Sequence, residues 1–404
     1  MKSTKTPSTS AALAANAGLH PERAARLLAV LQSEIDRQRL PGAVAMIVRN
    51  GKVVMFESLG QQNPADASSM ALDSIFRIYS MTKPIVSVAV LMLMEQGKLL
   101  LSDPVGKYLP EYAKQQVTAE IDGQVAYAAV AKSATVQDLL RHTAGLTYEF
   151  LGNSAVQKAY RSAKIGMGLR DASNAEFSRT LAAQPLQFEP GTVWEYSRAT
   201  DVLGALVEAV SGQTLGNFLQ DEIFKPLKML ETGFSVPAEK HHRIAEPFKH
   251  DPDGGIPLRL INIQTPPQFE SGGGGLVSTA HDYALFLQFM LNKGELDGVR
   301  LLSSHTVDFM TADHLGHLPV SAASAGTLLP PGHGFGLGFA VRTAAGISAV
   351  LGSAGVYYWG GIAGTTFFVD PKLDMFAILM IQAPNQRDYY RPLFRNLVYA
   401  ALEA

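Results

Sequence analysis

The chain has 404 residues, of which 47% are hydrophobic and 17% are charged, a profile typical of a folded protein with a large core. Lysine and arginine number 34 against 36 acidic residues, so the charge gives no reason to expect nucleic acid or an anionic membrane as a partner. Cysteine is absent, which excludes disulfides, thiol nucleophiles and zinc bound by cysteine.

The beginning of the chain predicts a tail. Residues 1–18 are polar and small, and we expect them to be disordered. Their apolar run, residues 11–15, is mostly alanine and too weak for the core of a signal peptide. Later apolar stretches such as 85–94 are too short to span a bilayer, so the sequence predicts a cytoplasmic protein.

A helix and a hairpin are predicted first. Leucines recur with helical spacing over 21–38. The dipeptide Asn50-Gly51 lies between apolar runs at 43–49 and 52–58, and this arrangement is a strong signal for two strands joined by a tight turn.

A long apolar helix is predicted next, opening at Ser80 and ending at Gly97, because glycine commonly ends helices. Pro84 falls in the first turn, where its missing N–H does no harm. Apolar side chains occupy nearly every side of this helix over 85–94, which indicates a central, buried position.

The middle of the chain is predicted to be mostly helical with long loops. Its expected helices lie at 135–141, 200–210, 214–223 and 280–292, and Thr279 with Asp282 resembles a capping box for the last of them. Strand patterning returns at 338–342, 364–369 and 375–381, before a final helix at 390–402. Strands at both ends with helices between them predict a sheet built from both chain ends and an inserted helical region.

The first segment that could carry chemistry is Ser80-Met81-Thr82-Lys83. A helix places positions i and i+3 on one face, so the hydroxyl and the amine can lie side by side. A neutral amine can take the serine proton, and burial and the positive helix N-terminus both disfavour a charged amine. The alternative is a helix start with Ser80 as a cap and Lys83 in solvent, which the spacing alone favours.

Two later segments have comparable alternatives. Trp194-Glu195-Tyr196-Ser197-Arg198 offers a phenol that could relay a proton, or a buried tyrosine satisfied by backbone. In the segment 357–362, adjacent glycines let a ligand approach backbone N–H groups, and this strand edge could complete an oxyanion hole with the Ser80 N–H. Its alternative is a glycine-rich turn with an aromatic anchor.

Competing motifs do not match. Gly352-Ser353-Ala354-Gly355 is close to the nucleophile motif of α/β-hydrolases, but Leu351 occupies the position of the first glycine, so Ser353 is predicted to be a loop residue. The glycine run at 272–275 lacks the Gly-Lys of a phosphate loop, and the histidines show no metal-ligand spacing. We expect the run to serve tight packing beside the cleft.

In this order the three segments resemble the serine β-lactamase and penicillin-binding-protein-like superfamily, and most of all the family VIII carboxylesterases, which share the class C β-lactamase fold. The resemblance covers nearly the whole chain, from the hairpin to the last helix. Supporting segments are Phe76-Arg77-Ile78-Tyr79, residues 139–146, 272–279 and 334–339.

The resemblance implies an α/β (α+β) fold with an antiparallel sheet flanked by helices. The sheet domain would comprise 19–100 and 330–404, the mainly helical domain 101–329, and the active site would lie in the cleft between them. Ser80 would be the acylated nucleophile, Lys83 its proton acceptor and Tyr196 a proton relay. The remaining implied roles are the Ser80 and Ile362 N–H groups as oxyanion hole, and substrate binding by Tyr79, Arg198, Trp359, Gly360 and Gly361.

Two positions depart from the lactamase pattern. Arg198 stands where lactamases carry asparagine, and Trp359-Gly360-Gly361 stands where they carry Lys-Thr-Gly. A neutral tryptophan cannot pair with a β-lactam carboxylate as that lysine does. The substitution favours neutral esters, although Arg198 could still recognise an acidic group.

The sequence thus predicts a serine hydrolase that cleaves small-molecule carboxylic esters with short- to medium-chain acyl groups through an acyl-enzyme. No metal, organic cofactor, nucleic acid or membrane is expected to take part, and the oligomeric state is left open. The alternatives are a β-lactamase or D-amino-acid peptidase or amidase, an acyltransferase, and a non-enzymatic β-lactam sensor.

Overall fold

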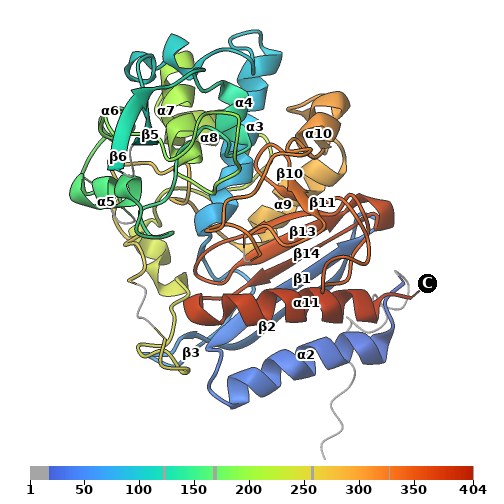
Figure 1. Cartoon of the computed structure of the whole chain (residues 1–404). Helices are drawn as coiled ribbons and strands as arrows, with labels where there is room; N and C mark the ends of the chain where they lie inside the picture. Colours follow the sequence, from blue (N-terminus) through green and yellow to red (C-terminus); the bar gives the residue numbers. More distant parts are fainter. Residues whose placement is uncertain (1–17, 122–123, 167–170, 256–258, 327, 404) are drawn as a thin grey trace, which may run out of the picture.

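The computed structural model describes residues 18–121, 124–166, 171–255, 259–326 and 328–403 (Figure 1). The predicted disordered tail, apart from Gly18, therefore lies outside the described residues. In the described part of the chain, no helix combines the length and the apolar character needed to cross a membrane. The cytoplasmic location stays a prediction.

One antiparallel sheet of eight strands organises the molecule, in the order β10-β11-β12-β13-β14-β1-β2-β3. Its strands are β1 (Gly42–Arg49), β2 (Lys52–Asn63), β3 (Ser68–Ser69), β10 (His333–Phe335), β11 (Ala340–Arg342), β12 (Tyr357–Gly360), β13 (Thr366–Asp370) and β14 (Met375–Met380). The two chain ends meet where β1 pairs with β14, with Val44 opposite Met380 and Arg49 opposite Met375. The predicted sheet of strands from both ends is confirmed.

The two faces of the sheet bury different cores, because successive side chains of a strand point to opposite faces. One face, with Ala45 and Leu379, packs against α2 (Pro21–Asp36) and α11 (Arg387–Ala401), which lie side by side in Figure 1. The other face, with Val44 and Ile378, joins a larger core that includes α3 (Thr82–Glu95) and α9 (Ala280–Leu291). Because both faces are covered, β14 is apolar throughout and β1 is apolar up to Val48, rather than alternating.

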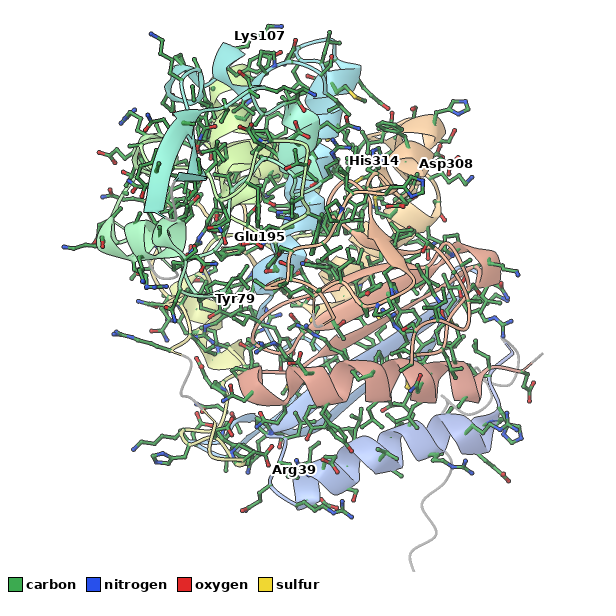
Figure 2. The ribbon with its side chains drawn as sticks, in the orientation of Figure 1. Arg39, Tyr79, Lys107, Glu195, Asp308 and His314 are labelled. Atoms are coloured by element: carbon green, nitrogen blue, oxygen red, sulfur yellow. The ribbon has the colours of Figure 1, made fainter. Side chains whose placement is uncertain are left out.

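The rest of the chain forms a mainly helical region beside the sheet (Figure 1). Its helices are α4 (Val136–Leu140), α5 (Ala155–Ser162), α6 (Asn174–Ala182), α7 (Ala199–Ser211), α8 (Leu215–Leu219) and α10 (Ser304–Met310). Its short strand pairs are β4 (Phe76–Arg77) with β7 (Val277–Ser278), β5 (Gln116–Ile121) with β6 (Gln124–Ala129), and β8 (Glu295–Leu296) with β9 (Val299–Arg300). Figure 2 places Tyr79 and Glu195 in the middle of the molecule, with Lys107 and Arg39 at opposite ends.

Turn and cap signals explain most of the element boundaries. Asn50 and Gly51 both adopt positive φ, as the predicted hairpin turn requires. Gly212 adopts the left-handed conformation directly after α7, and Gly97 does so after the cap residue of α3, which ends those helices. The Thr279 side chain caps α9 by accepting the Asp282 N–H.

Two expectations need correction, and a third stays untested. The capping box at Thr279 is only half formed, because the Asp282 carboxylate accepts instead from the Glu231 N–H and the Thr232 hydroxyl. The helix predicted at 214–223 changes to a π-helical turn from Gln220. The predicted division into two domains stays a prediction, and α9, inside the stretch assigned to the helical domain, packs on β1 and β14.

Candidate active site

Ser80 lies in a strained turn at the entrance to α3. The turn is a 3₁₀ segment, Tyr79–Met81, and Tyr79 has a φ of +42°, a conformation that costs a non-glycine residue about 1–3 kcal/mol. The Tyr79 hydroxyl accepts the Ile261 N–H at 2.9 Å, and Ile78, just before it, donates to the Leu276 carbonyl at 3.1 Å. Burial raises the pKa of Tyr79, so this phenol keeps its proton. These contacts hold the turn that presents Ser80 to the cavity.

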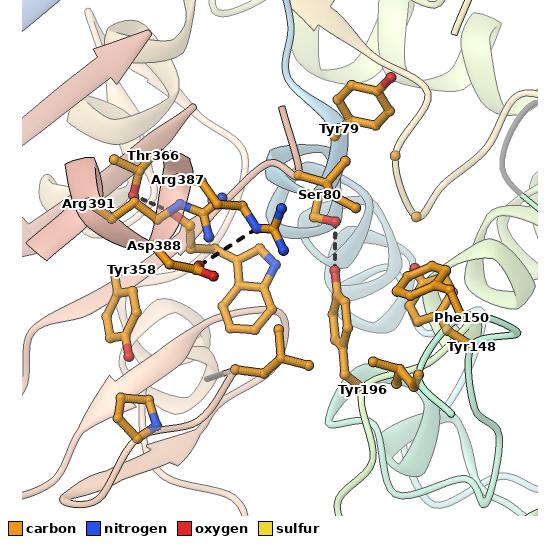
Figure 3. A pocket seen from close by; sticks show the side chains of 18 of the residues that line it. Tyr79, Ser80, Tyr148, Phe150, Tyr196, Tyr358, Thr366, Arg387, Asp388 and Arg391 are labelled. Atoms are coloured by element: carbon orange, nitrogen blue, oxygen red, sulfur yellow. Dashed lines mark hydrogen bonds and ion pairs between the residues drawn. The ribbon is translucent and has the colours of Figure 1, made fainter. Parts of the chain in front are cut away.

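Two predicted groups, from Lys83 and Tyr196, converge on the Ser80 hydroxyl. The Tyr196 hydroxyl donates to Ser80 Oγ at 2.6 Å, although the two residues are 116 positions apart (Figure 3). Lys83 Nζ lies 3.2 Å from the same oxygen. The spacing of Ser80 and Lys83 therefore places them side by side, and Tyr196 reaches them from the loop before α7.

Lys83 is completely buried beneath the cavity, and its amine meets three oxygen atoms. Besides Ser80 Oγ, these are the Gly273 carbonyl at 2.6 Å and the Tyr148 hydroxyl at 3.0 Å. A protonated amine can donate to all three. A neutral amine can donate to two of them and accept the Ser80 proton on its lone pair. Solvation of Lys83 at a helix start, the alternative interpretation, is wrong.

Tyr148 is a site residue that the sequence did not single out. Its hydroxyl contacts Lys83, and its ring lies 5.1 Å from the ring of Tyr196. Burial and the neighbouring Tyr196 raise the pKa of Tyr148 well above its usual value, so the phenol stays neutral. The only signal in the sequence was its place two residues after the family-like segment 139–146.

Arg198 supports this arrangement from behind. Its guanidinium binds Glu149 at 2.7 Å and Asp201 at 3.3 Å, and it lies 4.7 Å from the ring centre of Tyr148. Burial lowers the pKa of Arg198, but the carboxylates of Glu149 and Asp201 outweigh that effect and raise it. Asp201 in turn accepts the N–H of Gly273, whose carbonyl holds Lys83. Binding an acidic substrate group, the predicted role of Arg198, would require it to leave these carboxylates.

The glycine run at 272–275 allows this close packing. A Cβ at Gly273 would lie 2.9 Å from the carboxylate oxygens of Asp201, and one at Gly272 would overlap the Thr200 carbonyl. Glycine at these positions lets the loop touch α7, in line with the predicted packing role.

Burial also determines the protonation state of a neighbouring histidine, His142. His142 packs 5.1 Å from the ring of Tyr196, and its Nδ1 lies 3.1 Å from Ser197 Oγ. Burial lowers the pKa of His142 well below its usual value. A neutral imidazole therefore backs the tyrosine.

The opposite wall of the cavity is the C-terminal end of β12 and the turn that follows it. Trp359, Gly360 and Ile362 line the cavity, whereas Gly361 does not. A Cβ at Gly361 would overlap the Ile78 carbonyl oxygen, so this glycine lets the sheet approach the turn that carries Ser80. The Trp359 ring lies 5.3 Å from the ring of Tyr196. Contact of Gly361 with substrate finds no support in this geometry.

The cavity has a volume of about 730 Å³ and two unlike halves. The half beside Tyr148 is apolar, with Phe150, Leu151, Ile261, Pro267 and Phe269 on its walls. The half over α11 combines Arg387, Asp388 and Arg391 (Figure 3) with the apolar side chains of Pro392 and Phe394. Within the residues that the structure describes, no group of three or more histidine or acidic side chains could hold a metal ion.

Comparisons with known proteins give a consistent result. The Beta-lactamase family matches residues 26–400. Esterase EstB of Burkholderia gladioli is 34% identical over 400 residues, covering 93% of this chain and 95% of that protein. Protein Rv1367c of Mycobacterium tuberculosis is 33% identical over 360 residues, 88% of each chain. The solved structure of EstCE1, a hydrolase with promiscuous acyltransferase activity, has a TM-score of 0.77 at 29% identity and covers 93% of this chain and 98% of its own.

Proposed function

The chain belongs to the Beta-lactamase family, as a serine hydrolase of its esterase type, and we propose that it cleaves carboxylic esters through an acyl-enzyme on Ser80. The observation that carries this proposal is the convergence of Lys83 Nζ and the Tyr196 hydroxyl on Ser80 Oγ, at 3.2 and 2.6 Å. A nucleophile within hydrogen-bond reach of a base, which is itself held by further groups, is the arrangement that nucleophilic catalysis needs.

Acylation begins when neutral Lys83 takes the Ser80 proton and Ser80 Oγ bonds to the ester carbonyl carbon. The carbonyl electron pair moves onto oxygen, where the N–H groups of Ser80 and Ile362 stabilise it. One such donor typically contributes about 3 kcal/mol to lowering the barrier. The tetrahedral species then collapses, the bond to the alcohol oxygen breaks, and Tyr196 passes the proton from Lys83 to that oxygen.

Deacylation follows the same proton route in reverse. A water molecule gives its proton to Lys83 through Tyr196 and bonds to the acyl carbon. The bond to Ser80 Oγ breaks, Ser80 regains its proton, and the carboxylic acid leaves. Every group in these steps is a side chain or backbone N–H of this chain, a water molecule or the ester.

The walls of the cavity support short- to medium-chain acyl groups as substrates. Its apolar half, next to Ser80, can bury an acyl chain between Tyr148 and Phe269, and burying apolar surface contributes about 25 cal/mol per Å². On the opposite wall, Trp359 offers no charge to a β-lactam carboxylate, which disfavours strong lactamase activity. Such activity, and amide cleavage by the same residues, remain the less favoured alternatives.

Substitution of the nucleophile tests the proposal. Ser80→Ala should reduce hydrolysis of a short-chain p-nitrophenyl ester to background while leaving the thermal unfolding temperature nearly unchanged, because only one hydroxyl is removed. Ser353→Ala is the matched control, since Ser353 lies in the motif nearest to that of the α/β-hydrolases. Wild-type hydrolysis by purified Ser80→Ala, or its loss in Ser353→Ala alone, would overturn the assignment.

Acyl transfer to an alcohol is a second candidate, favoured by the similarity to EstCE1, a hydrolase with promiscuous acyltransferase activity. The acyl-enzyme is the same, and the alcohol takes the place of water. Product analysis with added primary alcohols checks this candidate. A new ester formed by wild type and not by Ser80→Ala supports it, and free acid as the sole product refutes it.

A further inference from the structure

The peptide that joins Gly361 to Ile362 has its carbonyl held from one side. The Gly361 oxygen accepts hydrogen bonds from Arg391 Nη2 and from the Gly364 N–H, the latter at 2.9 Å. Gly361 itself donates to the Thr365 carbonyl at 2.8 Å, and Arg391 reaches that carbonyl at 3.5 Å. Arg391 therefore binds both carbonyls that close this turn.

Because the peptide is planar, holding its carbonyl also fixes the direction of its N–H. The Gly361 carbonyl and the Ile362 N–H belong to one peptide unit, which is trans, so the two groups point in opposite directions. With the carbonyl facing Arg391, the N–H must face away from α11. Figure 3 shows Arg391 and Ser80 on different sides of the cavity, and Ile362 lines that cavity. Among the described residues, the Ile362 N–H has no protein acceptor.

We infer that Arg391 is a positioning residue, which fixes the Gly361–Ile362 peptide so that the Ile362 N–H serves as an oxyanion donor. The inference rests on the proposed function. Arg391 acts through the peptide and touches neither the ester nor Ser80 in this role. Its contact also strengthens the donor, because a cation on the carbonyl oxygen polarises the peptide and makes its N–H more positive.

The surroundings of Arg391 fit this role better than a purely structural one. Arg198 is balanced by two carboxylates, whereas within the described part of the chain no carboxylate forms an ion pair with Arg391. Asp388, one turn earlier on α11, pairs with Arg387 instead. Burial and the charge of Arg387 lower the pKa of Arg391 to about 10, so it stays cationic at neutral pH. The carbonyls of the turn are thus its main partners.

Gly360 makes the approach of Arg391 possible. A Cβ at this position would lie 2.8 Å from the guanidinium carbon of Arg391 and 2.8 Å from the Thr365 carbonyl oxygen. Close packing within the protein therefore explains both glycines of Trp359-Gly360-Gly361. One admits Arg391, and the other admits the Ile78 carbonyl at the nucleophile turn.

The test compares Arg391→Met and Arg391→Lys with wild type on a p-nitrophenyl ester and on its thiono analogue, in which sulfur replaces the carbonyl oxygen. Losing a whole oxyanion donor costs about 10²–10³ in kcat, so a donor that is turned away should cost about 10- to 100-fold. KM should change by less than about twofold, because the interaction forms mainly in the transition state. The lysine variant should recover part of the loss, since an ammonium can still donate to the Gly361 oxygen.

The thiono ester distinguishes a misoriented oxyanion donor from general damage to the folded protein. Sulfur accepts hydrogen bonds weakly, so the preference of wild type for the oxygen ester should fall in Arg391→Met by about the factor lost in kcat. Arg300→Met is the matched control, because Arg300 also donates to two backbone carbonyls, at 3.1 Å each, and does not line the cavity. Arg300→Met should keep the wild-type kcat and the wild-type preference for the oxygen ester over the thiono ester.

Two outcomes overturn the inference: a folded Arg391→Met with kcat within twofold of wild type, or an equal loss on both esters. If the methionine variant does not fold, Arg391→Lys is compared with wild type on the same two esters. An unchanged preference of Arg391→Lys for the oxygen ester would then overturn the inference. Full activity of Arg391→Met with an inactive Ser80→Ala refutes the positioning role alone. An active Ser80→Ala refutes the proposed function as well.

Discussion

The two walls of the cavity differ in what they bring to the proposed reaction. On the helical wall, side chains react: Ser80, Lys83 and Tyr196, each with polar partners behind it. On the sheet wall the contribution comes from the backbone, because the proposed oxyanion donor is the N–H of Ile362 and no side chain there takes its place. The difference teaches that changes on the helical wall delete a reacting group, whereas changes on the sheet wall move a donor that is still present.

The largest effect is expected for Lys83→Met, which removes the base from the helical wall. A positioned base contributes about 10²–10⁴ to the rate, so kcat/KM should fall by about 10³. Steady-state kinetics on a p-nitrophenyl ester measures it. Lys107→Met, at an exposed lysine far from the cavity, is the control and should keep wild-type kinetics. A fall of less than tenfold in Lys83→Met would contradict its role as the base.

The two tyrosines of the helical wall should differ from each other. The Tyr196 hydroxyl contacts Ser80 directly, whereas the Tyr148 hydroxyl contacts Lys83. Tyr196→Phe should therefore lower kcat/KM by about 100-fold and Tyr148→Phe by about tenfold, because the first loses a relay and the second a partner of the base. Parallel kinetics of both variants decides the order. A larger loss in Tyr148→Phe would mean that the relay has been assigned to the wrong phenol.

On the sheet wall, Gly361→Ala should give a loss of about tenfold in kcat. The added Cβ meets the Ile78 carbonyl, so the turn carrying the Ile362 N–H must shift away from Ser80. Gly233→Ala is the control, since a Cβ there has its nearest neighbour at 3.8 Å. Kinetics and thermal unfolding of both variants provide the comparison. If Gly361→Ala keeps wild-type kcat, the sheet wall does not need this close approach.

The smallest effect is on stability and concerns the buried imidazole of the helical wall. The pKa of His142 is lower in the folded chain than its usual value of about 6.5, so the unfolded chain takes up the proton first as the pH falls. Its contribution to the free energy of unfolding is present above pH 6.5 and is lost below it, by up to about 1.4 kcal/mol per pH unit. His142→Asn suits the positive φ of this residue and cannot titrate.

Urea unfolding at pH 7.5 and 5.5 tests this expectation. Wild type should lose about 1 kcal/mol more than His142→Asn between the two values. Equal losses would show that the imidazole is protonated in the folded protein, or that it titrates as in the unfolded chain.

The sequence predicted most of what depends on local pattern. The Asn50-Gly51 hairpin, the buried helix after Ser80 and the pairing of Ser80 with Lys83 follow from spacing within a few residues. The segments of Tyr196 and Ile362 were only candidates with plain structural alternatives, and their roles were assigned by the family resemblance, because nothing near them in the sequence fixes their distance from Ser80. The short strand β12 and the β5–β6 hairpin were missed, since their runs lack the clear alternation that marks a strand.

Tyr148 and Arg391 show why the rest was out of reach. Tyr148 meets Lys83 across 65 residues, and Arg391 on α11 meets the β12–β13 turn across 30 residues. Such contacts are fixed by packing and by the direction of one peptide plane. Neither of these leaves a spacing pattern along the chain. The glycines of Trp359-Gly360-Gly361 were predicted to admit a ligand, and their neighbours show that they also admit protein atoms.

Covalent labelling tests the convergence on Ser80 most directly. The purified protein is treated with an aryl phosphonate, which phosphonylates an activated serine, and the modified peptide is mapped by mass spectrometry. We expect one adduct per chain, on the peptide that contains Ser80, and much slower labelling of Lys83→Met. An adduct on Ser353 or another serine, or labelling of Ser80 at the same rate without Lys83, would contradict the account.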